Sequence, residues 1–148
     1  MEDKKLKIIG ALILAIIVLG AAFAFTNTEK DSNSAEENRE ILPKPSNKTT
    51  IYFFWGDGCP VCAKEKPFIE ELDQKHEDLE VRMYEVYYNE TNQKLYQNMA
   101  KKYGFQARNV PGTFLAEEYW IGFSNSIRNE IEAKTTECLD KKCESPLK

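Results

Sequence analysis

The sequence predicts an α/β domain whose elements follow the order βαβ and then ββα. Two observations lead to this prediction. Strand-like runs rich in β-branched and aromatic residues alternate with stretches of helical periodicity, and the first such run breaks at glycines. The first two strands are expected to be parallel if the helix between them is a right-handed crossover.

The elements can be placed in chain order. The first strand should be buried on both faces, because its apolar run is continuous. The second helix should end at Gly104, a natural C-terminal cap. Four runs have strand composition: Thr49–Trp55, Val81–Tyr88, Thr113–Ala116 and Tyr119–Phe123. Three stretches have helical periodicity: Cys59 to about His76, Glu90–Tyr103 and Asn125 to about Cys138.

The amino-terminal segment predicts attachment to a membrane. Lys4, Lys5 and Lys7 precede Ile8–Phe25, a run of 18 apolar or small residues without charge. The positive-inside rule places the lysines in the cytoplasm and the rest of the chain outside it. Eighteen helical residues span about 27 Å, which is enough for a hydrocarbon core, so we favour an uncleaved single-pass anchor. Ala22-Phe23-Ala24 also fits a signal-peptidase site, and cleavage after Ala24 would give a secreted domain.

The composition changes sharply after the apolar run. Asn, Ser, Glu, Asp and Lys dominate residues 26–48, and Pro43 and Pro45 stand near the end. Such a segment buries too little apolar area to offset the entropy lost on ordering, so it predicts a flexible linker. We therefore divide the chain into a membrane segment (1–25), a linker (26–48) and a folded domain (49–148).

Charge and histidine content exclude two classes of partner. The net charge is -4 and the basic residues are scattered among acids, so the sequence predicts no binding of nucleic acid. A structural zinc site needs four ligands, and His76 is the one histidine of the chain. This argues against Cys59 and Cys62 being half of such a site. We expect no metal and no cofactor apart from a redox-active cysteine pair.

The candidate chemistry lies in Cys59-Pro60-Val61-Cys62. Two thiols three residues apart, where a strand ends and a helix begins, can close a disulfide across the first helical turn. Cys59, partly exposed at the helix start, should be the nucleophile, and the more buried Cys62 should resolve the mixed disulfide. Pro60 suits the first helical position, where its missing N–H has no cost.

These residues and two further motifs together resemble the thioredoxin superfamily. The chain has Trp55 shortly before the cysteine pair, Pro67 five positions after Cys62, and the element Val110-Pro111-Gly112-Thr113-Phe114. The resemblance spans Thr49–Glu137 and implies a central mixed four-stranded sheet flanked by helices, in a layout closer to glutaredoxin. It also implies that Pro111 is cis and packs against the active-site sulfurs, while Val110 offers backbone groups to a substrate segment.

One position departs from the family pattern. Phe53 stands where thioredoxins that act as reductants carry a buried aspartate that assists proton transfer. The proton must then pass through water or another acid, and Glu85 on the neighbouring strand is a candidate. We expect Trp55 and the group Tyr84, Tyr87 and Tyr88 to pack in the core.

Cys138 and Cys143 form a second candidate pair. Residues five apart on a continuous helix point about 140° away from each other, so a bond requires the helix to end near Leu139. A structural disulfide that pins the carboxyl-terminal tail is favoured. The alternatives are a second exchange pair that relays electrons to or from Cys59, or free or metal-binding thiols.

The sequence therefore predicts a membrane-tethered, extracytoplasmic thiol-disulfide oxidoreductase. Its partners would be protein thiols and disulfides, together with a membrane redox partner if the domain is a reductase. The direction of transfer, oxidase or isomerase against reductase, stays open. The alternative is a non-catalytic module that binds a soft metal, such as copper, through Cys59 and Cys62.

Overall fold

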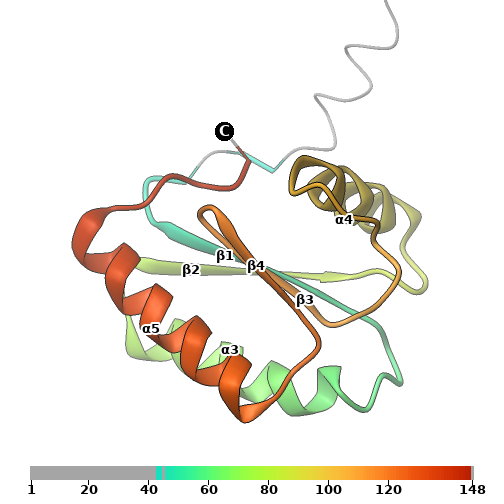
Figure 1. The fold of residues 1–148 in the computed structure, drawn as a ribbon, viewed down its shortest axis with the longest axis horizontal. Helices are drawn as coiled ribbons and strands as arrows, with labels where there is room; N and C mark the ends of the chain where they lie inside the picture. The colour runs from blue at the N-terminus through green and yellow to red at the C-terminus, as the bar shows by residue number, and fades with distance from the viewer. Residues whose placement is uncertain (1–42, 45, 148) are drawn as a thin grey trace, which may run out of the picture. The chain divides into compact units, whose positions relative to one another are not determined.

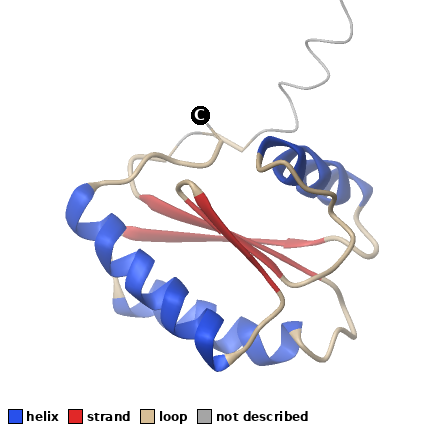
Figure 2. Ribbon diagram, in the orientation of Figure 1, coloured by secondary structure: helices blue, strands red, loops and turns tan. Residues whose placement is uncertain are grey.

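The computed structural model describes residues 43, 44 and 46–147, and these form a sheet with helices on both faces (Figures 1 and 2). The strands are β1 (Thr49–Trp55), β2 (Leu79–Glu85), β3 (Gly112–Leu115) and β4 (Glu118–Ile121). The helices are α3 (Cys62–Lys75), α4 (Glu90–Lys102) and α5 (Asn125–Lys141). This order confirms the α/β class and the predicted sequence of elements.

The sheet is mixed, and its strand order is β2-β1-β3-β4. β1 pairs in parallel with β2 and antiparallel with β3, and β3 pairs antiparallel with β4. α3 and α5 cover one face of the sheet and α4 covers the other (Figure 1). Because side chains alternate along a strand, Ile51 and Phe53 pack with α3 and α5, whereas Tyr52 and Phe54 pack with α4. Each of these fully buried side chains stabilises the fold by about 1.5–3 kcal/mol.

β2 begins and ends earlier than the composition predicts. It ends at Glu85, so Tyr87 and Tyr88 lie in the following loop, where they are 54% and 81% exposed. The expectation that these two tyrosines pack in the core is therefore wrong. The cause is local: the Glu85 carboxylate accepts the N–H groups of Tyr87 and Tyr88, which turns the chain out of the sheet.

The other boundaries differ by small shifts. The hairpin turn consists of Ala116 and Glu117, one residue before the predicted turn, because Ala116 adopts the left-handed conformation with φ 52°. α4 begins after Asn89, whose side chain accepts the N–H of Asn92, and Gly104 follows its end with φ 78°. α4 ends at Lys102, one residue before the predicted Tyr103, and the expected glycine cap at Gly104 is confirmed.

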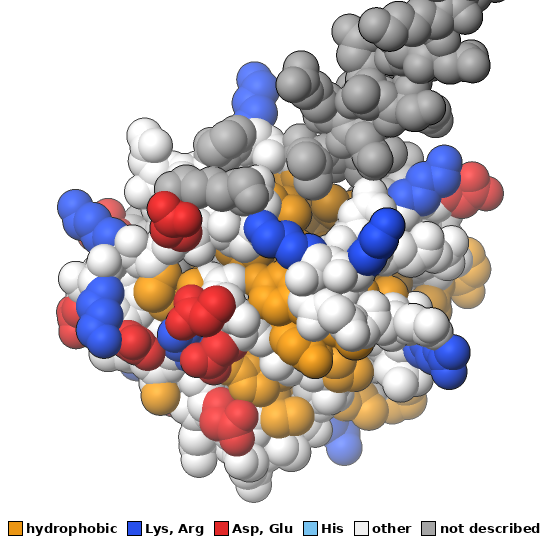
Figure 3. Space-filling view, turned by 45° about the horizontal axis from the view of Figure 1, so that its top comes forward, with side chains coloured by type: hydrophobic (Ala, Val, Ile, Leu, Met, Phe, Trp, Pro, Cys, Tyr) orange, Lys and Arg blue, Asp and Glu red, His pale blue; other side chains and the backbone are white. Residues whose placement is uncertain are grey.

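The predicted membrane segment, residues 1–25, lies outside the described residues, and so does the linker except for Pro43, Lys44 and Ser46–Lys48. Within the described part of the chain, no helix combines the length and the apolar character needed to cross a bilayer. On the face shown in Figure 3, acidic and basic side chains are interspersed with apolar ones.

Candidate active site

A short turn carries the chain from β1 to the cysteine pair. The N–H of Cys59 donates to the carbonyl oxygen of Gly56 at 3.2 Å, and Gly58 has φ 75°, a conformation that favours glycine. α3 is regular from Cys62 onward, three residues after the predicted start at Cys59. The N–H of Ala63 donates to the Cys59 carbonyl oxygen four residues back, as in a helix, whereas the N–H of Lys64 bonds to Val61 three residues back, so Pro60 lies in a tight turn that leads into the helix.

The two sulfurs of Cys59 and Cys62 are joined in a disulfide. Cys59 is 9% exposed and Cys62 is 2% exposed, so the first cysteine is the more accessible. The N–H of Cys62 points at Cys59 Sγ at 3.1 Å. Val61, the N-cap of α3, has no polar side-chain atom to compete for the N–H groups of the first turn. After reduction, these groups would stabilise a thiolate on Cys59.

The Val110–Pro111 peptide bond is cis, the form that the resemblance implies. The fold brings this loop to the cysteines although it lies far along the chain: the carbonyl oxygen of Val110 is 3.9 Å from Cys59 Sγ. Tyr96 holds the loop from α4 by donating its hydroxyl to the carbonyl oxygen of Asn109 at 2.6 Å. The structure therefore places Cys59, Cys62, Val110 and Pro111 together.

A hollow of about 290 Å³ lies beside the disulfide on the side of α3. Lys66 stands over the Trp55 ring, 4.5 Å from its centre, at one wall of this hollow. The remaining lining residues come from the turn and the first helical turn: Gly56, Asp57, Gly58, Cys59, Pro60, Cys62 and Ala63. Cys59 thus faces open space on one side and the cis-proline loop on the other.

Glu65 is a buried acid that the sequence analysis missed. It lies one helical turn after Cys62, is 0% exposed, and accepts the Thr113 hydroxyl through Oε1 at 2.5 Å. Its Oε2 has no hydrogen-bond partner among the described residues. Burial raises the pKa of Glu65 to about 7, against a smaller lowering by the Thr113 hydrogen bond. A carboxyl group in this state can exchange a proton near neutral pH.

Glu85, the acid that the sequence suggested, is in a different state. Its carboxylate accepts the backbone N–H groups of Asp57, Tyr87 and Tyr88. Desolvation raises the pKa of Glu85, but the hydrogen bonds from these N–H groups outweigh it and hold the pKa below its usual value. Glu85 therefore stays ionised and is a poor proton donor at neutral pH.

Cys138 and Cys143 also form a disulfide, at the other end of β1. α5 continues to Lys141, past the predicted end, and the bond closes because Lys142 turns the chain with φ 55°. Cys138 is fully buried, and its carbonyl oxygen accepts the hydroxyl of Thr49, the first residue of β1, at 3.2 Å. This pair is therefore remote from Cys59, which follows the last residue of β1.

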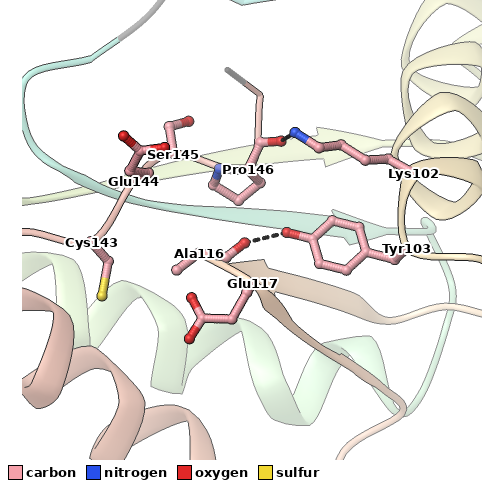
Figure 4. Close-up of a pocket in the computed structure, with 8 residues that line it drawn as sticks. All are labelled: Lys102, Tyr103, Ala116, Glu117, Cys143, Glu144, Ser145 and Pro146. Atoms are coloured by element: carbon pink, nitrogen blue, oxygen red, sulfur yellow. Dashed lines mark hydrogen bonds between the residues drawn. The ribbon is translucent and has the colours of Figure 1, made fainter.

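A larger hollow, of about 530 Å³, adjoins the second disulfide and not the first (Figure 4). The tail that follows Cys143 borders it, and Lys102 Nζ donates to the Pro146 carbonyl oxygen across it. The Tyr103 hydroxyl donates to the Ala116 carbonyl oxygen at its floor. This hollow is larger than the one beside Cys59, but Cys59, Cys62 and Glu65 do not line it.

Comparison with known proteins identifies the family. A model of the thioredoxin-like domain matches residues 37–118, more than half of the chain. A solved structure assigned as the thiol:disulfide interchange protein DsbE, from Chlorobium tepidum, has 14% identity and a TM-score of 0.50, covering 63% of this chain and 81% of that one. Oxidised mitochondrial thioredoxin 3 from Saccharomyces cerevisiae has 15% identity and a TM-score of 0.50, covering 70% and 89%. At these identities, the likeness to both solved structures shows a shared fold.

A search of curated proteins finds no match. The family assignment therefore depends on the match of the domain model and agrees with the architecture and with the cysteine pair set against a cis proline. This chain belongs to the thioredoxin-like domain family.

Proposed function

We propose that the domain is a thiol-disulfide oxidoreductase that exchanges disulfides with protein substrates through Cys59-Pro60-Val61-Cys62. One observation carries the proposal. The sulfur of Cys59, the less buried of the two cysteines, lies 3.1 Å from the N–H of Cys62 and 3.9 Å from the carbonyl oxygen of Val110, beside the cis proline. A nucleophilic sulfur, a resolving sulfur and a backbone edge for a substrate segment thus meet at one place.

The reaction follows from this arrangement. In the reduced enzyme, the Cys59 thiolate attacks one sulfur of a substrate disulfide; the substrate S–S bond breaks and its other sulfur leaves as a thiolate. Cys62 then loses its proton and attacks Cys59 Sγ, which releases the second substrate thiolate and forms the Cys59–Cys62 bond. Two electrons pass to the substrate, and the reverse sequence oxidises a substrate dithiol.

Two further groups complete the mechanism. Glu65 takes the proton that Cys62 loses, because it lies one turn away on the same side of α3 and its pKa is about 7. Val110 and Pro111 bind the substrate, with the backbone of Val110 pairing with an extended segment next to the substrate cysteine. Thr113 orients Glu65 through its hydroxyl.

The proposed location is the outer side of a membrane, with the domain tethered by residues 8–25. In that compartment the domain would oxidise or isomerise exported proteins, or reduce them with electrons from a transmembrane carrier; its reduction potential relative to the partner decides which. We assign Cys138–Cys143 a structural role, because its Cys138 sulfur is buried among apolar side chains.

Trapping the intermediate tests the proposal. Cys62→Ala should accumulate protein-linked mixed disulfides at Cys59, because nothing remains to resolve them, and the double variant Cys59→Ala with Cys62→Ala is the matched control. Mass-tagged thiols, resolved by peptide, locate the adduct. A carrier of a soft metal such as copper would need both sulfurs and would give no adducts, and that result would reject the oxidoreductase.

A further inference from the structure

Two loops leave the carboxyl edge of the sheet next to each other. Glu85, the last residue of β2, pairs in register with Trp55, the last residue of β1. The loop after Trp55 leads through the turn to Cys59, and the loop after Glu85 leads to α4. The N–H of Val86 donates to the carbonyl oxygen of Trp55 at 2.9 Å, the last rung of this pairing.

The Glu85 carboxylate joins the two loops beyond this rung. Its Oε1 accepts the N–H of Tyr87 at 2.7 Å and the N–H of Asp57 at 3.3 Å, and its Oε2 accepts the N–H of Tyr88 at 3.0 Å. Charge-assisted hydrogen bonds of this kind are stronger than neutral ones. One side chain therefore fixes its own loop and also reaches across to the turn that carries Cys59.

A second contact reinforces the junction. The Tyr87 ring lies on the backbone of Gly56, so close that an added Cβ at Gly56 would stand 2.4 Å from the ring. Gly56 accepts the N–H of Cys59, which makes Asp57 and Gly58 the central residues of the turn. The turn contains two glycines and has little stiffness of its own. Backbone hydrogen bonds join Cys59 to Gly56 and to Ala63, and the contacts from Glu85 and Tyr87 add a tie between this turn and the neighbouring loop that does not depend on the Cys59–Cys62 bond.

We propose that Glu85 is a positioning residue for the attacking sulfur: through Asp57 it holds the turn that keeps Cys59 Sγ beside the N–H of Cys62 and the carbonyl of Val110. This role rests on the proposed function and makes Glu85 part of the site without contact to substrate. Its contribution is largest in the reduced enzyme, because the disulfide holds Cys59 in the oxidised one.

Shortening the side chain tests this in the full-length protein. Glu85→Asp keeps the charge and can still accept the N–H of Tyr87 in an Asx turn, but it cannot reach Asp57. The Asp57 amide should lose protection from hydrogen exchange, and alkylation of reduced Cys59 by iodoacetamide at pH 7 should slow about tenfold, with a higher apparent thiol pKa in the pH profile. The urea midpoint of the oxidised protein should change little.

Three further variants complete the test. Glu85→Ala should slow alkylation of Cys59 as Glu85→Asp does, and it replaces Glu85→Asp in the test if that variant fails to fold. Glu85→Gln should restore the wild-type rate, because its carbonyl oxygen can take the place of Oε1. Glu77→Asp makes the same change at an exposed residue at the other end of β2 and should have no effect.

The outcomes separate the two proposals. An unchanged pH profile in both Glu85→Asp and Glu85→Ala, or equal slowing in Glu77→Asp, would overturn the positioning role. Alkylation needs no protein substrate, so a wild-type protein that exchanges with no protein disulfide would reject the proposed function and still leave this comparison intact.

Discussion

The two disulfides occupy opposite ends of β1 and differ in what surrounds their sulfurs. At the carboxyl end, Cys59 is the more accessible partner of a pair that faces a cis proline and precedes a buried acid. At the amino end, Cys138 is fully buried among apolar side chains of the cluster under α3 and α5. Both bonds close short segments, so the span of chain that is closed does not distinguish them.

The surroundings of the leaving sulfur distinguish the two bonds. Attack of a substrate thiolate on Cys59 would release Cys62, which is also buried but lies one helical turn from Glu65, an acid with a pKa of about 7 that can protonate it. Attack on the half-buried Cys143 would release a Cys138 thiolate into apolar surroundings, where burial disfavours the charge. The same chemical bond is therefore suited to exchange at one end of the strand and to a structural role at the other.

Removing the nucleophile should give the largest effect. Cys59→Ser should lower the rate of protein-disulfide exchange by at least about 10³-fold, because an alcohol cannot replace the thiolate. Turnover of a fluorescent protein disulfide measures the rate, and Cys143→Ser provides the comparison at the other end. Equal losses in the two variants would contradict the division of roles.

The buried acid should make stability depend on pH. Glu65 has a folded-state pKa of about 7 against an ordinary 4.5, so the folded state binds the proton more tightly. Stability is then greatest below about pH 4.5 and falls as pH rises to about 7, by roughly 3 kcal/mol in total. Glu65→Gln should remove this fall. Urea titrations at pH 5 and pH 8 of both proteins check it, and a parallel fall in the variant would contradict the assignment.

Opening the other disulfide should affect stability and not exchange. Replacing Cys138 and Cys143 together by alanine should lower the free energy of unfolding by about 2 kcal/mol, because the closed loop is short. Denaturant unfolding measures the loss, with exchange followed in the same samples. A collapse of the exchange rate would instead identify this pair as an electron relay.

A matched pair of threonine variants should give the smallest effects. Thr113→Val removes the donor to Glu65, which should raise the pKa of Glu65 further and move the pH profile of exchange upward. Thr49→Val removes the donor to the Cys138 carbonyl and should cost about 1 kcal/mol of stability without moving the profile. Stopped-flow measurements of exchange across pH, together with denaturant unfolding of both variants, check these two expectations. Identical pH profiles for Thr113→Val and Thr49→Val would contradict a role of Thr113 in setting the pKa of Glu65.

The sequence predicted the fold well where hydrophobic pattern decides structure. The continuous apolar run of β1 predicted a central strand, and the structure gives the predicted bounds, Thr49–Trp55. The X-Pro motif led to the cis bond at Pro111 through the family resemblance. Boundaries that depend on single hydrogen bonds were less predictable, such as the end of β2, where the Glu85 carboxylate turns the chain.

The buried acid was missed although the pattern contained a signal. Glu65 precedes Phe68 by three residues and Leu72 by seven, so helical periodicity places it on the apolar face of α3. Charged side chains are rarely buried without a partner, so composition alone gives no reason to place it in the core. The second disulfide was harder to foresee in detail, because Lys142 adopts a left-handed conformation that a residue with a side chain rarely takes.

β1 is synthesised before two of the segments that cover it, α5 and the residues that follow Cys143. Thr49 bonds to Cys138 across 89 positions, and Tyr52 contacts Ser145 across 93. During translation the most apolar strand of the domain therefore emerges before α5 and the tail that cover its amino end exist. The nascent domain must keep that strand from associating with other chains until its last residues have left the ribosome.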